Sequence, residues 1–227
     1  MKLVSYKTED KEHLGIFVNG HIYNLNSCHK LIPDDMNAFL TGGEPLMERA
    51  KQVNQDILDG KLQPKEEVFY ELLAPVPHPT SCRDGYAFRQ HVAAARRNRK
   101  VDMIAEFDQY PIFYFTNHNA IQGPGEIECM PDHFQKLDFE LEVAVVIGKK
   151  GRNVKAAEAD EYIAGYTIMN DMSARTLQME EMLLNLGPAK GKDFSTVIGP
   201  WLVTPDELEP YKVAAKENHV GNAYNLS

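Results

Sequence analysis

The sequence predicts a mixed α/β protein dominated by strands. Short apolar runs separated by turn residues fill the first 25 residues, a segment with one apolar helical face follows, and further strand signals come after a proline-rich stretch. At 227 residues, the chain is long enough to bury a core without the support of disulfides or a structural metal.

Residues 1–25 are expected to form a small antiparallel unit. Residues 14–18 and 21–25 have the apolar character of strands, and Asn19 and Gly20 lie between them. An Asn-Gly pair between two such runs is a strong hairpin signal, because both residues tolerate a positive φ. The N-terminal part is therefore expected to be a β domain.

A helix is expected to cover this unit. Pro45 suits the start of a helix and Gly60 its end, and the apolar residues between them are spaced by four, three and four. They are Leu46, Ala50, Val53 and Ile57. Residues 73–80 then carry three prolines, which favour a linker. We expect one domain over residues 1–73 and a second over 74–227.

The charge balance disfavours some function classes. The chain has 24 Lys and Arg against 33 Asp and Glu, a formal net charge of -9, which argues against binding to nucleic acid or to an anionic membrane. Cys28, Cys82 and Cys129 form neither a disulfide framework nor a zinc pattern. No stretch approaches the roughly 20 apolar residues of a membrane span, and the first residues lack a signal region. We expect a cytoplasmic protein.

The most informative segment is residues 137–148, LDFELEVAVVIG. At a strand period of two, its two faces separate the apolar residues Phe139, Leu141, Val143, Val145 and Ile147 from the acids Asp138, Glu140 and Glu142. A solvent-facing acidic surface over a core is the simpler interpretation. However, the acidic face turns apolar at Ala144 and Val146, which indicates partial cover. Two glutamates there lie about 7 Å apart at Cα and repel each other, a conflict that a cation would resolve.

A further carboxylate stands where the apolar run 165–169 ends and a helix is expected to begin. Asp171 or Ser173 suits the N-cap of that helix, which is among the commonest roles for such residues. Arg175 and Gln178 are three positions apart on the helix and can face one site together.

The segment 187–194, GPAKGKDF, resembles a phosphate-binding P-loop only superficially. The spacing between the glycines is one residue too short, and Asp193 stands where Ser or Thr would contact magnesium. Gly187 followed by Pro188 is typical of a helix end. Lys192 on such a loop, near carboxylates, suits the stabilisation of an enolate. Upstream, residues 81–91 place an acid, a phenol and an imidazole within one or two turns.

Taken together, four segments resemble the fumarylacetoacetate hydrolase family in order and spacing. They are RDGYAFRQHV at 83–92, LDFELEVAVVIGKKGRN at 137–153, YIAGYTIMNDMSAR with Gln178 at 162–178, and GPAKGKDFSTVIGPWLVT at 187–204. The resemblance covers about residues 74 to 210. It implies a mixed β-roll after the small N-terminal β domain with its helix. The family normally continues with further strands, so the resemblance implies a β-roll whose C-terminal part is missing from these 227 residues.

The resemblance also implies site residues. The positions that match the family's metal ligands, which hold Mg²⁺, Mn²⁺ or Ca²⁺, are Asp84, Glu140, Glu142 and Asp171. Oxygen-only ligation suits such hard cations. His91 matches the histidine that activates water, and Lys192 matches the lysine that steadies the developing enolate. The positions that match substrate contacts are Tyr86, Tyr114, Arg175 and Gln178.

The function that this resemblance implies is metal-dependent hydrolysis of a carbon-carbon bond in a β-diketo acid, fumarylacetoacetate-like or acylpyruvate-like, through a metal-bound enolate. Such reactions belong to aromatic catabolism. The metal would act as Lewis acid, His91 as general base and Lys192 as electrostatic stabiliser. Position 94, three after His91, is alanine, where acylpyruvate-cleaving and decarboxylating members often carry glutamate; this favours the fumarylacetoacetate-cleaving branch.

Two alternatives stay open. The same site serves hydratases, isomerases and decarboxylases of 2-oxo acids, and a shortened chain could instead be a catalytically silent protein that binds a metal or a partner. Family members are usually homodimers, so a homodimer that binds a small diketo acid is expected.

Overall fold

The N-terminal hairpin forms where the sequence predicts it. Asn19 and Gly20 have φ values of 51° and 92°, and Val18 pairs directly with His21 across the turn. This turn joins β2 (Lys11–Val18) to β3 (His21–Asn24), and β1 (Lys2–Thr8) pairs with the other edge of β2. The predicted antiparallel unit is therefore confirmed.

The predicted helix is α3 (Glu44–Leu58), and its apolar face covers this unit. Ala50 and Val53 are buried in the N-terminal core, and Gly60 has a positive φ just after the helix. Two short helices, α1 (Leu25–Cys28) and α2 (Met36–Thr41), complete the cover. The core cluster consists of Met1, Leu3, Leu14, Ile16, Val18, Leu25, Ile32, Met36, Phe39, Ala50, Val53 and Leu202.

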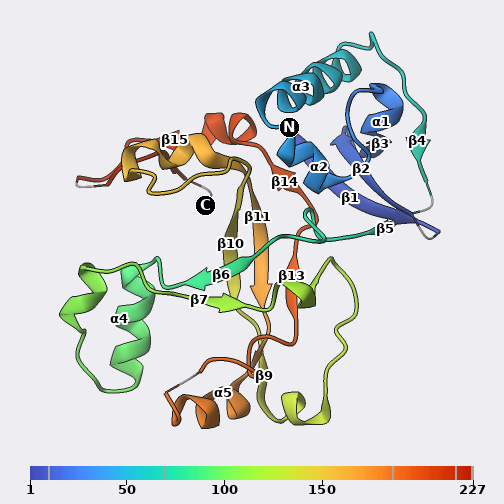
Figure 1. The fold of residues 1–227 in the computed structure, drawn as a ribbon. Coiled ribbons are helices and arrows are strands. Elements are labelled where there is room, and N and C mark those ends of the chain that lie inside the picture. Colours follow the sequence, from blue (N-terminus) through green and yellow to red (C-terminus); the bar gives the residue numbers. More distant parts are fainter. Residues whose placement is uncertain (10, 69, 186, 218, 226–227) are drawn as a thin grey trace.

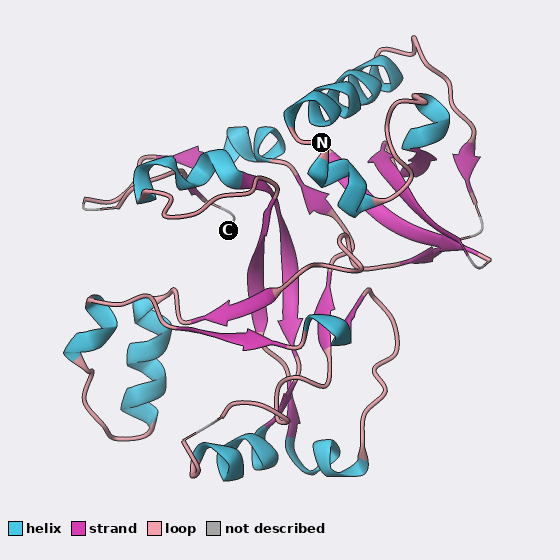
Figure 2. Ribbon diagram, viewed as in Figure 1, coloured by secondary structure: helices cyan, strands magenta, loops and turns pink. Residues whose placement is uncertain are grey.

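The structure, a computed structural model, describes residues 1–9, 11–68, 70–185, 187–217 and 219–225. Within these residues, ten strands form one mixed sheet. Besides β1, β2 and β3, they are β4 (Glu66–Glu67), β5 (Glu71–Leu72), β8 (Ile121–Gln122), β10 (Leu141–Ile147), β11 (Ile163–Asp171), β13 (Thr196–Ile198) and β14 (Leu202–Val203). The main path of the sheet runs β4-β3-β2-β1-β14-β11-β13-β8. β10 pairs with β11 and β5 with β1 outside this path. Figure 1 shows β10 and β11 at the centre of the molecule, and Figure 2 shows helices around the strands. The predicted strand-rich mixed α/β class is confirmed.

The other elements surround this sheet. Smaller sheets pair β6 (Cys82–Gly85) with β7 (Phe113–Thr116), β9 (Leu137–Asp138) with β12 (Ser173–Ala174), and β15 (Lys212–Val213) with β16 (Ala223–Tyr224). The other helices are α4 (Arg89–Asn98), α5 (Arg175–Met182) and the 3-10 segments η1 (Ala105–Asp108), η2 (His118–Ala120), η3 (Pro131–Lys136), η4 (Ala156–Tyr162) and η5 (Pro205–Tyr211).

The apolar face of β10 is exposed and its acidic face is half-buried, which is the reverse of an acidic surface over an apolar core. Leu141 is 77% exposed and Ile147 is 61% exposed, so the apolar face points outward. Glu140 and Glu142 lie half-buried on the other side, and Val146 on that side packs against the N-terminal core. The interpretation of a solvent-facing acidic surface over a core is therefore wrong, and the partial cover of the acidic face is confirmed.

The expected division at residue 73 stays a prediction. Strand pairing crosses it, because β1 pairs with β14, which in turn pairs with the central strand β11. The α-ammonium of Met1 adds a second connection: it lies 2.8 Å from Thr204 Oγ1 and 2.9 Å from Asp206 Oδ2. Among the helices that the structure describes, none is long and apolar enough to cross a membrane.

Candidate metal centre

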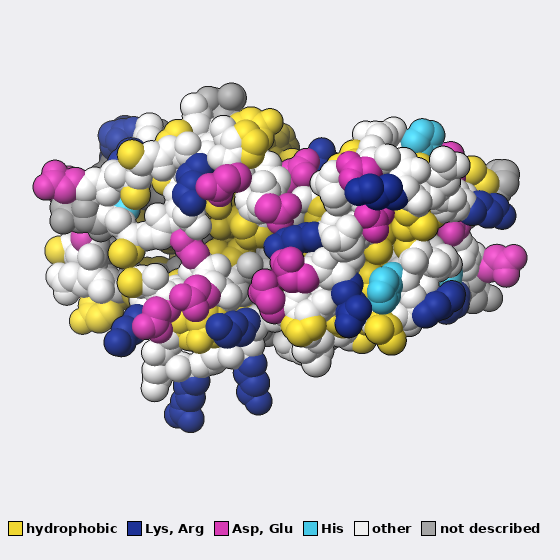
Figure 3. Space-filling view, turned by 90° about the horizontal axis from the view of Figure 1, so that it is seen from above, with side chains coloured by type: hydrophobic (Ala, Val, Ile, Leu, Met, Phe, Trp, Pro, Cys, Tyr) yellow, Lys and Arg dark blue, Asp and Glu magenta, His cyan; other side chains and the backbone are white. Residues whose placement is uncertain are grey.

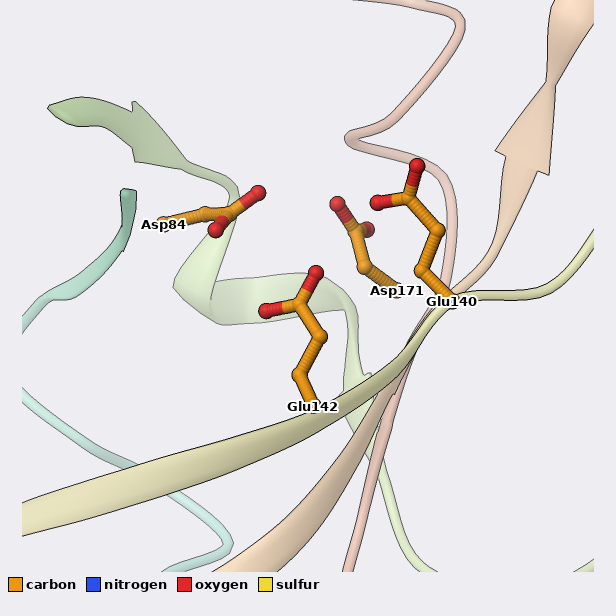
Figure 4. Close-up of side chains that lie close together, drawn as sticks. All are labelled: Asp84, Glu140, Glu142 and Asp171. Carbon is orange, nitrogen blue, oxygen red and sulfur yellow. The ribbon is translucent and has the colours of Figure 1, made fainter. Parts of the chain in front are cut away.

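Four carboxylates from separate parts of the chain converge at the end of the central strands. Asp84, Glu140, Glu142 and Asp171 each offer one oxygen, and these oxygens lie within 4.8 Å of one another. In Figure 4 the four side chains point into one shared space. Like charges at this distance repel one another, so the arrangement needs positive charge nearby.

Backbone pairing fixes the positions of these side chains. Glu140 donates its N–H to Asn170 Oδ1 at 3.1 Å, and its carbonyl accepts from the N–H of Asp171 at 3.1 Å. Glu142 pairs with Met169 in the β10–β11 ladder. On the β6–β7 hairpin, Asp84 stands opposite Tyr114. The cluster therefore depends on the register of two strand pairs rather than on a flexible loop.

Two basic side chains offset part of the negative charge. Lys192 is only 4% exposed, and its Nζ lies 2.5 Å from Glu140 Oε2 and 3.0 Å from Asp171 Oδ2. The guanidinium of Arg175 lies 2.7 Å from Glu140 Oε1 and 2.9 Å from Asp138 Oδ2. Glu140 is thus paired with both cations, whereas Asp171 meets only Lys192.

The pKa values follow from this uneven pairing. Burial, together with the neighbouring carboxylates of Asp84 and Asp171, raises the pKa of Glu142 to about 8. Burial also raises the pKa of Asp171 to about 6, although Lys192 opposes it. Burial acts in the same sense on Glu140, but Lys192 and Arg175 outweigh it and lower its pKa. Glu142 is therefore the member with most to gain from a cation.

The residues present fit a hard divalent cation. Asp171 Oδ1 is fully buried and has no hydrogen-bond partner among the described residues, while its other oxygen meets Lys192. An unpaired buried carboxylate oxygen is costly unless a cation or donor reaches it. The donor set is four carboxylates, which is the ligand chemistry of Mg²⁺, Mn²⁺ and Ca²⁺.

Tyr114 joins two members of the cluster. Its hydroxyl lies 2.6 Å from Asp84 Oδ2 and 2.9 Å from Asp171 Oδ2, and burial raises its pKa, so the phenol keeps its proton. Tyr114 and Lys192 also line a cavity of about 490 Å³, together with Phe115, Thr116, Asn117, Gly187, Pro188, Ala189 and Asp193. This volume is in the range of small-molecule sites. The cavity therefore adjoins the carboxylate cluster through Tyr114 and Lys192, the two lining side chains that contact it.

Arg175 and Gln178 face the same site, as their spacing predicts. The guanidinium of Arg175 donates to Gln178 Oε1 at 3.1 Å. The N-cap interpretation of the preceding residues is wrong: α5 has Ala174 at its N-cap and no side-chain cap, and Ser173 donates to the carbonyl of Asp171 instead. Asp171 is the last residue of β11, and its side chain belongs to the carboxylate cluster.

The side chains of Tyr86 and His91 form no hydrogen bond or ion pair with the four carboxylates. Tyr86 is 54% exposed. His91 lies exposed in the first turn of α4, and its side chain has no hydrogen bond or ion pair to the residues that the structure describes. Their substrate-contacting and water-activating roles stay predictions. The sequence gives no signal for the cavity wall at Asn117, whose side chain donates to the carbonyl of Asp193 at 3.1 Å.

Comparison with known proteins extends this picture. The human protein named mitochondrial oxaloacetate tautomerase FAHD2A is 33% identical over 220 residues, which is 92% of this chain and 64% of the relative. A FAHD2 homologue from Dictyostelium discoideum is 31% identical over 233 residues, which is 100% of this chain and 71% of the relative. The chain thus spans less than two thirds of the length of the human relative.

Solved structures agree in fold. A fumarylacetoacetate hydrolase from Exiguobacterium antarcticum superposes with a TM-score of 0.61 at 23% identity, over 93% of this chain and 69% of that one. A putative HpcE protein from Mycobacterium smegmatis gives a TM-score of 0.65 at 20% identity, over 93% and 70%. The family model for the C-terminal part of fumarylacetoacetate hydrolase matches residues 80–223, which contain all four carboxylates. The chain therefore belongs to the fumarylacetoacetate hydrolase family.

Proposed function

We propose that the chain catalyses a divalent-metal-dependent keto–enol tautomerisation of a short 2-oxo acid, with oxaloacetate as the first substrate to test. The observation that carries this proposal is the carboxylate cluster, with the unpaired Asp171 Oδ1, next to one nearly buried lysine. The relative named oxaloacetate tautomerase, at 33% identity, supports this choice within the family.

Tautomerisation moves one proton between the carbon next to the carbonyl group and the carbonyl oxygen, while negative charge is stabilised on that oxygen. In this proposal a solvent water molecule takes the proton from one atom and returns a proton to the other, so that none is gained or lost overall. Asp84, Glu140, Glu142 and Asp171 would hold the cation, which would supply Lewis-acid polarisation of the substrate oxygens. Burial acts to lower the pKa of Lys192, but Asp171 and Glu140 outweigh it and raise the pKa, so this side chain is a cation at neutral pH. It supplies a fixed positive charge beside the cavity.

Two further side chains orient the substrate in this proposal. Tyr114 keeps its proton, which its hydroxyl directs to Asp84 or Asp171 in this structure. With a cation on those carboxylates, the hydroxyl would turn this proton to a substrate oxygen in the cavity that it lines. Arg175 is half-buried and can exchange its ion pair with Asp138 for a carboxylate of the substrate. Bidentate arginine-carboxylate pairing fixes both position and direction.

Carbon-carbon hydrolysis, which the family resemblance implies, is the second candidate. It needs a base that activates water, and the predicted base, His91, follows Asp84 by seven residues on the hairpin arm formed by β6, β7 and α4. Tautomerisation adds no water to the substrate and needs only a carrier for the transferred proton, for which solvent water serves, so it does not depend on His91.

The test follows both reactions on the purified chain with Mg²⁺, Mn²⁺ or Ca²⁺. Loss of the enol absorbance of oxaloacetate reports tautomerisation, and pyruvate release from acylpyruvates reports hydrolysis. We expect enol loss above the spontaneous rate, abolished by EDTA and by Glu142→Gln, and retained in His91→Ala. Pyruvate release that disappears in His91→Ala would replace the first candidate by the second. Absence of both reactions would contradict the proposal and support a silent metal-binding protein.

The cellular setting is also a proposal. A homodimer, a cytoplasmic location and a small 2-oxo acid as the partner molecule remain the predictions made from the sequence; the human relative carries a mitochondrial name. On the face that Figure 3 shows, basic and acidic side chains are interspersed, without a continuous basic surface.

A further inference from the structure

The loop between α5 and β13 carries Lys192 into the carboxylate cluster. Residues 187–195 contain neither helix nor strand among those that the structure describes, so the loop needs its own supports. One is internal: the carbonyl of Ala189 accepts from the N–H groups of Lys192 and Asp193, both at 2.9 Å. Another comes from β12, where the N–H of Ala174 donates to the carbonyl of Gly191 at 2.8 Å.

A third support comes from Glu181 in α5, outside the cluster of four carboxylates. Its Oε2 accepts the N–H groups of Ala189 at 3.3 Å and Gly191 at 3.0 Å, and its Oε1 accepts the N–H of Lys190 at 3.2 Å. One carboxylate thus meets three successive N–H groups, directly before Lys192. The side chain is 12% exposed, and the exposed ammonium of Lys190 lies 2.8 Å from Oε1.

This contact leaves the loop little freedom. A Cβ on Gly191 would lie 2.7 Å from the backbone nitrogen of Gln178, so the loop packs closely on α5. Burial acts to raise the pKa of Glu181, but Lys190 and the backbone N–H groups outweigh it and hold the pKa below its usual value. The carboxylate is therefore ionised at neutral pH, the form that accepts N–H groups most strongly.

We propose that Glu181 is a positioning residue that acts through Lys192: by holding the Ala189–Gly191 backbone, it places the Lys192 ammonium between Glu140 and Asp171. The consequence for catalysis rests on the proposed function. The consequence for cation binding does not, because Lys192 occupies carboxylate oxygens whether or not a substrate turns over.

Glu181→Gln is the test substitution, because glutamine keeps the size but offers one acceptor oxygen and turns an NH₂ group toward the N–H donors. Glu180→Gln is the matched control, since Glu180 is the exposed neighbour on the same helix. Lys190→Met removes the ion pair of Glu181 and leaves its backbone hydrogen bonds. Lys192→Met removes the group through which Glu181 is proposed to act.

Two measurements need no substrate. Amide exchange followed by NMR should show faster exchange at positions 189–191 in Glu181→Gln than in the wild type or in either control. Mn²⁺ titration followed by electron paramagnetic resonance should show about threefold or more tighter binding in both Glu181→Gln and Lys192→Met. Lys192→Met removes the ammonium that competes for the carboxylates, and Glu181→Gln releases the loop that holds this ammonium in place. The double variant should add nothing to Lys192→Met, as expected for two residues that act as one unit.

Turnover gives the third readout. If the wild type is active, kcat in Glu181→Gln should fall about tenfold with KM little changed, the pattern of an interaction made in the transition state. If the wild type is inactive, the proposed function fails, while exchange and Mn²⁺ binding still decide the role of Glu181. Unchanged exchange and unchanged Mn²⁺ affinity, weaker Mn²⁺ binding, or effects that add in the double variant would each overturn the inference.

Discussion

Glu142 faces three other carboxylates from a half-buried position, and its pKa is raised to about 8. In the unfolded chain, a glutamate titrates near pH 4.5, so the folded state holds this proton more tightly. The contribution to stability is therefore fully present below pH 4.5 and is lost as the pH rises toward 8. Asp171, with its pKa raised to about 6, acts in the same direction.

We therefore expect the metal-free protein to become less stable between pH 5 and pH 8. Urea unfolding in the presence of EDTA measures this directly, and Glu142→Gln should make the dependence shallower because its amide does not titrate. A free energy of unfolding that rises through this window would contradict the raised pKa values.

Cation binding should reverse this trend. A divalent ion needs Glu142 ionised, so binding at pH 7 should release up to about one proton per ion, and affinity should increase as the pH rises toward 8. Calorimetry in two buffers with different ionisation enthalpies measures the number of protons. Glu142→Gln should lose most of the affinity, whereas Glu158→Gln, at an exposed position on η4, should retain it. Unchanged affinity in Glu142→Gln would exclude this carboxylate from the site.

At the scale of elements, the paired strands β10 and β11 differ in how closely they are packed: the outer face of β10 is exposed, whereas β11 packs tightly against β14. Leu141 on β10 is 77% exposed, so Leu141→Thr should change the free energy of unfolding by less than about 0.5 kcal/mol. Gly165 on β11 lies under β14: an added Cβ would be 2.6 Å from the carbonyl oxygen of Val203 and 2.8 Å from the side chain of Leu202. Gly165→Ala should therefore cost about 1–3 kcal/mol. Urea unfolding compares the two, and a larger loss for Leu141→Thr would contradict the exposure of the β10 outer face.

Local signals explain which elements could be predicted. The hairpin at Asn19 and Gly20 and the helix before Gly60 depend on nearby residues, so their sequence patterns are sufficient. The inward orientation of the acidic face of β10 could not be decided from the strand itself. It depends on the pairing of β10 with β11 and on the contact of Val146 with the N-terminal core, both distant in sequence.

The site shows the same division. The family resemblance identified the carboxylates, Lys192 and Tyr114, and the structure brings all of these together. The support of the Lys192 loop by Glu181 had no sequence signal, because backbone N–H groups are present at every residue except proline and only the fold directs three of them to one carboxylate. The N-cap interpretation of Asp171 failed because β11 extends to that residue.

At the scale of the whole molecule, the candidate site lies where distant segments meet, so cation binding should stabilise the folded chain as a unit. Magnesium at a hundredfold over Kd contributes about 2.7 kcal/mol, which raises the unfolding midpoint by roughly 5 to 10 °C for a chain of this size. Oxalate, which mimics a chelating enolate, should enlarge the rise. Absence of a shift with either ligand would show that the carboxylates do not bind the ion. Glu142→Gln is the control, because it lacks one proposed ligand and its unfolding midpoint should not respond to magnesium.

The alternation of β10 also restricts changes in chain length. Leu141 pairs with Asn170 and Glu142 with Met169, whereas the register shift of this ladder lies further along, between Val146 and Ile147. One residue inserted before Val143 would exchange the two faces, placing carboxylates outside and large apolar side chains among the remaining ligands. An extra residue near Val146 would fall where the pairing register already shifts, so it would leave the orientation of Glu142 unchanged. Length variation among functional relatives should therefore be confined to the far end of this strand.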